Sequence, residues 1–231
     1  MFKINALWFV LLTAWFFQLN EMFGQECTIM HTKKQPYVMG LKKMIDVNLD
    51  EVDTVTLPVV FHVVHTGSSS ENNISDEQIL SQVDVLNEEF EDSKIQFCMA
   101  VRDPDGNPTN GITRYDASWN DQYVLEGVSN GQMADVGWDQ QEMKQSSGCW
   151  NPDEYINYYV VSEINDNDGE NGIQGFAYLG PTGDCRDGVV VLYNATGTVG
   201  IQKPGRTLGF TGVHEMGHHL SLWHTFSNTS S

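Results

Sequence analysis

The chain has 231 residues, 40% of them apolar, and 31 acidic against 12 basic side chains, which gives a formal net charge of −19. This length suits one domain with a well-formed core. So large an excess of negative charge repels phosphate backbones, so we expect no nucleic-acid partner and interpret the charge as a solvated extracellular surface.

The amino-terminal segment, residues 1–25, is predicted to be a signal peptide. Lys3 precedes an apolar run from Ala6 to Phe17, and its length of about 12 residues is short of the roughly 20 that a helix needs to span a bilayer. A retained anchor is the alternative, and we expect secretion without a stable membrane anchor. Residues 26–53 show no sustained periodicity and are interpreted as a short leader or prosegment.

The folded domain is predicted to begin at residue 54. The nearly continuous apolar run from Leu57 to His65 is typical of a central strand. Ser75 and Gln78 form a capping-box pattern, and an amphipathic helix follows in which the apolar positions have helical spacing: Ile79, Val83, Leu86 and Phe90. Alternating apolar residues from Ile95 to Val101 predict a second strand.

Residues 102–152 are rich in Gly, Asn, Asp and Ser, and no helix or strand is assigned to them. Three more strands are predicted after this stretch, at Tyr155 to Ser162, Ile173 to Leu179 and Val189 to Tyr193. The order of strand, helix, four strands and a terminal helix predicts an α/β (α+β) layer with a mixed sheet.

Four cysteines, Cys27, Cys98, Cys149 and Cys185, allow two disulfides in an exported protein, with three possible connectivities. The acidic stretch from Asn165 to Gly172 raises the possibility of Ca²⁺, but its carboxylates do not follow the regular calcium-loop pattern. A solvated turn is the preferred interpretation of this stretch.

The terminal helix contains a metal-binding pattern. His214 and His218 are four residues apart and share one helix face, with Glu215 beside them. A catalytic Zn²⁺ needs three protein ligands and an open position, and His224 supplies the third ligand. The alternative, in which these histidines only line a helix, would bury polar groups without a partner. His219 points about 100° away from His218 and is interpreted as structural or surface.

This arrangement predicts hydrolysis by an activated water. Glu215 would act as the general base that takes a proton from the water and delivers it to a leaving amine. The metal ligands do not define the acyl group that is attacked, so a zinc hydrolase with a non-protein substrate is an alternative.

The segment HEMGHHLSLWHTF resembles the extended zinc signature of the metzincins. Its closing His-Thr-Phe, together with LPVVFHVVH and NPDEYINYYVV, is similar to the pappalysin and cytophagalysin branch of that clan. The resemblance implies a zinc endopeptidase with a protein or peptide substrate, built on a five-stranded twisted mixed sheet with a backing helix and an active-site helix. It also implies that Ile173 to Leu179 is an antiparallel edge strand on which the substrate lies, with these contact residues: Gly175, Phe176, Ala177 and Tyr178.

Two departures from the family pattern bear on the zinc site. Ser221 replaces a glycine that leaves the helix in a left-handed conformation, at a cost of about 1 kcal/mol. The methionine turn of metzincins lies downstream of the third histidine, and no methionine follows His224. Residues 54–231 are therefore interpreted as the amino-terminal part of a catalytic domain whose C-terminal subdomain is missing, and a catalytically impaired zinc- and peptide-binding module is the alternative function.

Some metzincins are kept latent by a cysteine of the prosegment, and Cys27 lies in the predicted prosegment. A disulfide is the alternative role of this residue. The sequence does not predict an oligomeric state.

Overall fold

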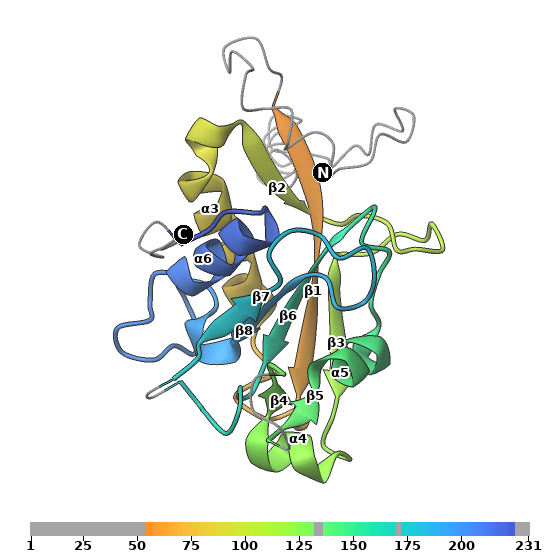
Figure 1. Ribbon diagram of the computed structural model, residues 1–231, viewed down its shortest axis with the longest axis vertical. Coiled ribbons are helices and arrows are strands. Elements are labelled where there is room, and N and C mark those ends of the chain that lie inside the picture. Colours follow the sequence, from red (N-terminus) through yellow and green to blue (C-terminus); the bar gives the residue numbers. More distant parts are fainter. Residues whose placement is uncertain (1–53, 132–135, 170–171, 225–231) are drawn as a thin grey trace, which may run out of the picture.

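The computed structural model describes residues 54–131, 136–169 and 172–224 (Figure 1). The predicted signal peptide, the predicted leader and Cys27 lie outside these residues, so those predictions stay open. Within the described residues, no helix is long and apolar enough to cross a membrane.

A mixed sheet forms the centre of the domain. Its strand order is β2-β1-β6-β8-β7, in which β7 is antiparallel to β8 and the other pairs are parallel. The bounds of these strands are Val55–His65 for β1, Ile95–Met99 for β2, Ile156–Val161 for β6, Gly175–Ala177 for β7 and Val189–Leu192 for β8. Strand β7 is the edge strand, as predicted, although it is shorter than the predicted segment.

A sixth strand, β3 (Ile112–Asp116), occupies the same edge of β1 as β2 does. Residues 55–59 of β1 pair with β2, and residues 61–65 pair with β3. Strand β6 pairs with residues 59–63 and therefore lies on the opposite edge. The sheet thus has the five predicted strand positions, and β3 lies within residues 102–152, for which no helix or strand was predicted.

Two long helices cover one face of the sheet. Helix α3 (Asp76–Glu89) is the predicted backing helix, and α6 (Phe210–His219) carries the metal-binding pattern beside it (Figure 1). Side chains alternate between the faces of a strand. Tyr158 of β6 lies under α6, where a Cβ on Gly212 would come within 2.4 Å of its hydroxyl, whereas Tyr159 lies under α5 (Gln140–Ser147) on the other face.

Smaller elements complete the described part of the chain. Helix α4 (Asp121–Glu126), β4 (Val128–Ser129), β5 (Trp138–Asp139) and α5 all fall within residues 102–152. Two short 3-10 turns, η3 (Glu91–Ser93) and η4 (Tyr193–Ala195), follow α3 and β8 respectively. Of the possible cysteine pairings, the structure contains the disulfide between Cys149 and Cys185.

The predicted capping box at the start of α3 forms only in part. Ser75 accepts a hydrogen bond from the backbone N–H of Gln78, as predicted. The side chain of Gln78 does not return to Ser75. Its amide nitrogen lies within 3.0 Å of three carbonyl oxygens in the segment before α6, those of Tyr193, Thr196 and Ile201.

A second buried glutamine one turn later, Gln82, extends this contact. Its amide donates to the Gly209 carbonyl at 3.0 Å, and its oxygen accepts from the Gly197 N–H at 2.8 Å. Gly209 is the N-cap of α6. Helix α3 therefore does more than cover the sheet, because it fixes the segment that leads into α6.

Candidate zinc site

Helix α6 and the turn after it bring three histidines together. His214 and His218 are one helical turn apart, and His224 follows the helix. One ring nitrogen of each histidine lies within 4.8 Å of the corresponding nitrogens of the other two. The separations between the Nε2 atoms are 3.0 Å for His214 and His224, 3.1 Å for His214 and His218, and 2.8 Å for His218 and His224.

These separations fit a zinc site. Zinc–nitrogen bonds of about 2.0–2.1 Å in tetrahedral geometry place ligand nitrogens about 3.3 Å apart. Burial, followed by the charges of His218 and His224, lowers the pKa of His214, which favours the neutral ring that a metal requires. The Nδ1 atom of His218 donates to the Leu222 carbonyl at 2.8 Å, so its Nε2 carries the lone pair toward the other two rings.

A Schellman turn ends α6 and brings His224 back to the helix. The N–H of Leu222 donates to the Gly217 carbonyl at 2.9 Å, and the N–H of Ser221 donates to the His218 carbonyl at 2.8 Å. Ser221 has φ of 74°. The left-handed conformation predicted at this residue is confirmed, and it is a conformation that glycine adopts at lower cost.

Glu215 lies beside the three histidines and is 7% exposed. Burial raises the pKa of its carboxyl group to about 7 in the metal-free protein. A divalent cation nearby would lower this pKa again. A carboxyl group whose pKa is close to neutral suits a residue that both accepts and returns a proton.

Edge strand β7 passes directly across Glu215. A Cβ added to Gly175 would come within 2.8 Å of the Glu215 Cγ atom and within 2.9 Å of the Val190 carbonyl oxygen. Gly175, Phe176 and Ala177 form β7, and Tyr178 follows the strand directly. The absence of a side chain at residue 175 thus allows the edge strand and the Glu215 side chain to lie in contact.

His219 is buried and does not join the metal cluster. Its Nδ1 atom lies 3.1 Å from an Asp187 carboxylate oxygen, and the two side chains are 5% and 2% exposed. Burial alone would raise the pKa of Asp187, but the hydrogen bond and charge of His219 and the Gly188 N–H hold this pKa below its usual value. The interpretation of His219 as a surface residue is wrong, and the structural interpretation is confirmed.

His62 and His65 of β1 are not part of the histidine cluster. His62 is buried on the α5 face, between the Thr113 hydroxyl at 2.8 Å and the Asn157 side-chain oxygen at 2.9 Å. Its burial, opposed by the Asn157 hydrogen bond, lowers its pKa to about 4. His65 accepts a hydrogen bond from the Gly67 N–H.

Sequence reasoning did not identify the long-range contacts of three buried polar residues, namely Gln78, Gln82 and Lys144. Each is at most 1% exposed. The signal was weak, because two glutamines four residues apart on the apolar face of a predicted helix are the only hint in the sequence. Lys144 lies in the stretch that had no assignment.

Comparisons with known proteins agree with this geometry. A family profile described as Peptidase_M43, pregnancy-associated plasma protein-A, matches residues 138–230. Among curated proteins, an extracellular metalloprotease of Verticillium alfalfae is 28% identical over 187 residues, which are 78% of this chain and 55% of that protein. An extracellular metalloprotease of Pyricularia oryzae is 30% identical over 178 residues, 74% and 51% of the two chains. The chain spans about half the length of the curated relatives it matches.

Two solved structures are also similar. Mirolysin in complex with a compound superposes with a TM-score of 0.60 and 32% identity, covering 77% of this chain and 67% of that one. Mature mirolysin of Tannerella forsythia in complex with a cleaved peptide gives a TM-score of 0.59 and 31% identity over the same shares. With the metzincin-like sheet and the histidine cluster, these similarities show that the chain belongs to the pappalysin-like M43 family of metalloproteases.

Proposed function

We propose that the protein is a secreted zinc endopeptidase in which His214, His218 and His224 hold the metal and Glu215 is the general base. The observation that carries the proposal is the convergence of three Nε2 atoms to within 3.1 Å of one another, next to a buried carboxyl group. Extracellular relatives support secretion, and the family supports zinc. Residues 1–25 as signal peptide and 54–231 as the first part of the catalytic domain remain predictions.

His214, His218 and His224 would hold a zinc ion, which would supply Lewis-acid polarisation of the scissile carbonyl and a water of lowered pKa. The carboxylate of Glu215 would accept a proton from the attacking water and pass it to the nitrogen of the leaving amine. The buried surroundings of Glu215 favour its protonated form, which makes acceptance of the proton from the water easier.

The free edge of β7 is the proposed substrate-binding surface. Within the described residues, β7 pairs only with β8, so the backbone groups of its other edge remain available to an extended peptide. Because Gly175 lies against Glu215, a peptide on this edge would pass next to the general base. The complex of mirolysin with a cleaved peptide supports a peptide substrate. Ca²⁺ binding is the alternative interpretation of the acidic stretch from Asn165 to Gly172.

Glu215→Gln tests the proposal. We expect wild-type protein to contain one zinc per chain and to cleave casein, and the variant to keep the zinc while losing at least about 10²-fold in kcat, as for removal of a general base. Glu88→Gln makes the same change on the exposed face of α3 and should leave both readouts unchanged. Equal cleavage by Glu215→Gln would refute the role of Glu215. Zinc without cleavage in the wild type would favour the peptide-binding module, for which the strained Ser221 turn is the supporting observation.

A further inference from the structure

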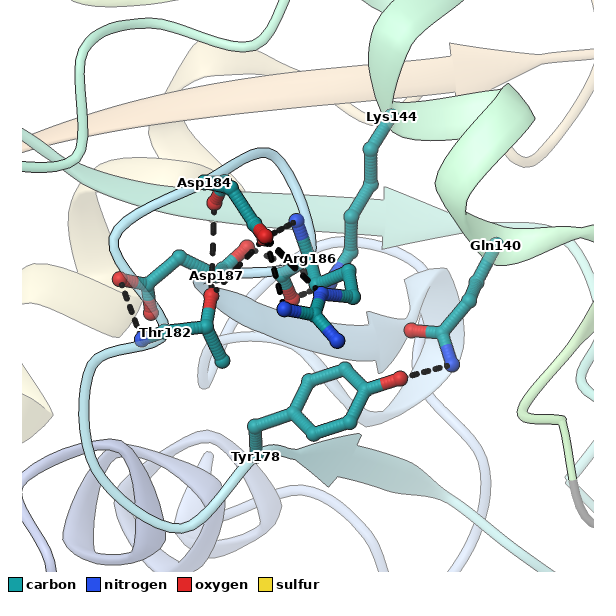
Figure 2. A network of polar contacts seen from close by, with 7 residues as sticks. All are labelled: Gln140, Lys144, Tyr178, Thr182, Asp184, Arg186 and Asp187. Carbon is teal, nitrogen blue, oxygen red and sulfur yellow. Dashed lines mark hydrogen bonds and ion pairs between the residues drawn. The ribbon is translucent and has the colours of Figure 1, made fainter.

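Helix α5 contains a fully buried lysine. Lys144 is 0% exposed, and its Nζ atom donates to the backbone carbonyls of Arg186 at 2.7 Å and of Asp187 at 3.2 Å. Burial lowers the pKa of Lys144 to about 7, opposed by the charges of Asp187 and Asp184. Its hydrogen-bond acceptors are thus backbone oxygens of one loop, the segment 180–188 that connects β7 to β8 (Figure 2).

Three aromatic rings surround the same nitrogen atom. The Nζ atom lies 5.4 Å from the ring centre of Tyr159 and 5.8 Å from those of Phe176 and Tyr178. These distances are within the range of cation–π attraction. Phe176 belongs to β7 and Tyr178 follows it, so two of the three rings come from the proposed substrate-binding edge. Lys144 contacts this edge from the sheet face opposite to Glu215.

The loop that Lys144 binds also reaches the active-site helix. The Asp187 carboxylate accepts hydrogen bonds from the N–H groups of Thr182 and Gly188, at 3.2 and 2.8 Å, and contacts His219 at 3.1 Å. His219 is the neighbour of the zinc-ligand candidate His218. The Gly180 N–H donates to the His218 carbonyl at 3.0 Å. One loop therefore joins Lys144 to the end of α6.

Two further contacts fix α5 to the same region. The disulfide between Cys149 and Cys185 joins the end of α5 to the loop, with Cα atoms 5.7 Å apart. At the start of α5, the Gln140 amide donates to the Tyr178 hydroxyl at 3.1 Å (Figure 2). The two ends of the helix thus flank Lys144 with independent connections to the edge strand and to the loop.

Burying the ammonium group of Lys144 costs folding free energy that an apolar side chain would not cost. A buried charge without a carboxylate partner is destabilising compared with an apolar residue of similar volume. A methionine would fill the space between the three rings, but it would make no directional contact with the loop carbonyls. What the lysine adds is therefore control of position rather than packing.

We propose that Lys144 is a positioning residue for substrate binding, which holds β7 and the loop 180–188 in place against the active-site helix. This inference rests on the proposed peptidase function, because it assigns the β7 edge to a bound peptide. Without the Lys144 side chain, β7 would keep its pairing with β8, but the free edge of β7 would lose its fixed position relative to Glu215.

The test compares Lys144→Met with Met143→Ala in the full secreted chain. Met143 is buried on the same helix, so its truncation destabilises α5 but keeps the ammonium group. We expect Lys144→Met to raise KM for a fluorogenic peptide about tenfold, as for loss of a charged hydrogen bond. We expect kcat to change less than about threefold and zinc content to stay at the wild-type level. Met143→Ala should lower thermal stability without raising KM.

Hydrogen exchange gives a readout that does not depend on cleavage. Lys144→Met should speed exchange of the backbone amides of residues 175–188 and leave those of α3 unchanged. Unchanged exchange, or an equal increase of KM in Met143→Ala, would overturn the proposal. Faster exchange combined with a wild-type protein that cleaves no peptide would instead refute the peptidase function and leave the positioning role in place.

A second variant covers the case in which Lys144→Met does not fold. Phe176→Leu removes a ring from the strand side of the contact and keeps the lysine. It should raise KM in the same direction and speed exchange in the same segment. Wild-type KM and exchange in a folded Phe176→Leu protein would overturn the proposal as well.

Discussion

Replacing Ser221 by glycine should strengthen the metal site. Ser221 lies between the ligand candidates His218 and His224 and has φ of 74°. A left-handed conformation costs a serine about 1 kcal/mol, and the greater freedom of glycine in the unfolded chain offsets about half of this. The expected gain in the free energy of unfolding is therefore about 0.5 kcal/mol, or a rise in Tm of about 1–2 °C for a domain of this size.

Zinc affinity is the sharper readout. Metal binding requires His224 to stay next to the helix and therefore requires the left-handed turn, and we expect the metal-free protein to leave this turn part of the time. Release of up to about 1 kcal/mol of strain should raise zinc affinity about two- to fivefold. Competition with a chromogenic chelator measures this change.

Lys94→Gly is the matched control. Lys94 also has a left-handed backbone, with φ of 61°, and lies at the end of η3. We expect this variant to gain a similar increase in Tm and to bind zinc with wild-type affinity. If Ser221→Gly gains stability but its zinc affinity is unchanged or lower, the turn does not limit metal binding, and the reasoning fails.

Three other predictions follow from contacts of the active-site helix. Gly212→Ala should lower the unfolding free energy by about 1–3 kcal/mol in a urea titration, because the added Cβ would meet the Tyr158 hydroxyl at 2.4 Å. Gly217→Ala should raise the unfolding free energy by about 0.5–1 kcal/mol, because the nearest neighbour of its added Cβ is 3.6 Å away. Destabilisation by both substitutions would contradict the packing described. In metal-free protein prepared with a chelator, the raised pKa of Glu215 lowers the unfolding free energy as pH rises from about 4.5 to about 7. The unfolding free energy of Glu215→Gln should therefore equal that of wild type near pH 4.5 and exceed it by up to about 3 kcal/mol at pH 8. A constant difference between the two proteins in thermal melts across this range would refute the raised pKa of Glu215. Gln78→Met should cost about 2–4 kcal/mol in the same urea titration, because it leaves buried carbonyls without a donor, and a loss below about 0.5 kcal/mol would show that water replaces the amide.

The sequence predicted the parts of the molecule that depend on local pattern. The spacing of His214 and His218 places them on one helix face wherever the helix lies, and the chain after the helix is too short to carry His224 far away. The continuous apolar run of β1 predicted a central strand, and this strand pairs on both edges. The edge position of β7 was predicted from the family resemblance rather than from its own residues.

The missed features depend on contacts between distant segments. Strand β3 is only five residues long and lies among turn residues, and its pairing with the second half of β1 is what defines it. Gln78 was assigned to a cap because the local pattern fits one, but its partners lie more than 110 residues later in the chain. Lys144 was missed because its carbonyl partners are more than 40 residues away.

The disulfide between Cys149 and Cys185 has a consequence for handling the protein. It spans 36 positions of the sequence and encloses both β6 and β7. A single backbone cut anywhere between the two cysteines, whether by the protein itself or by a contaminant, leaves the two pieces covalently joined. A nicked preparation would therefore migrate as an intact chain on a denaturing gel and separate into fragments only after the bond is reduced.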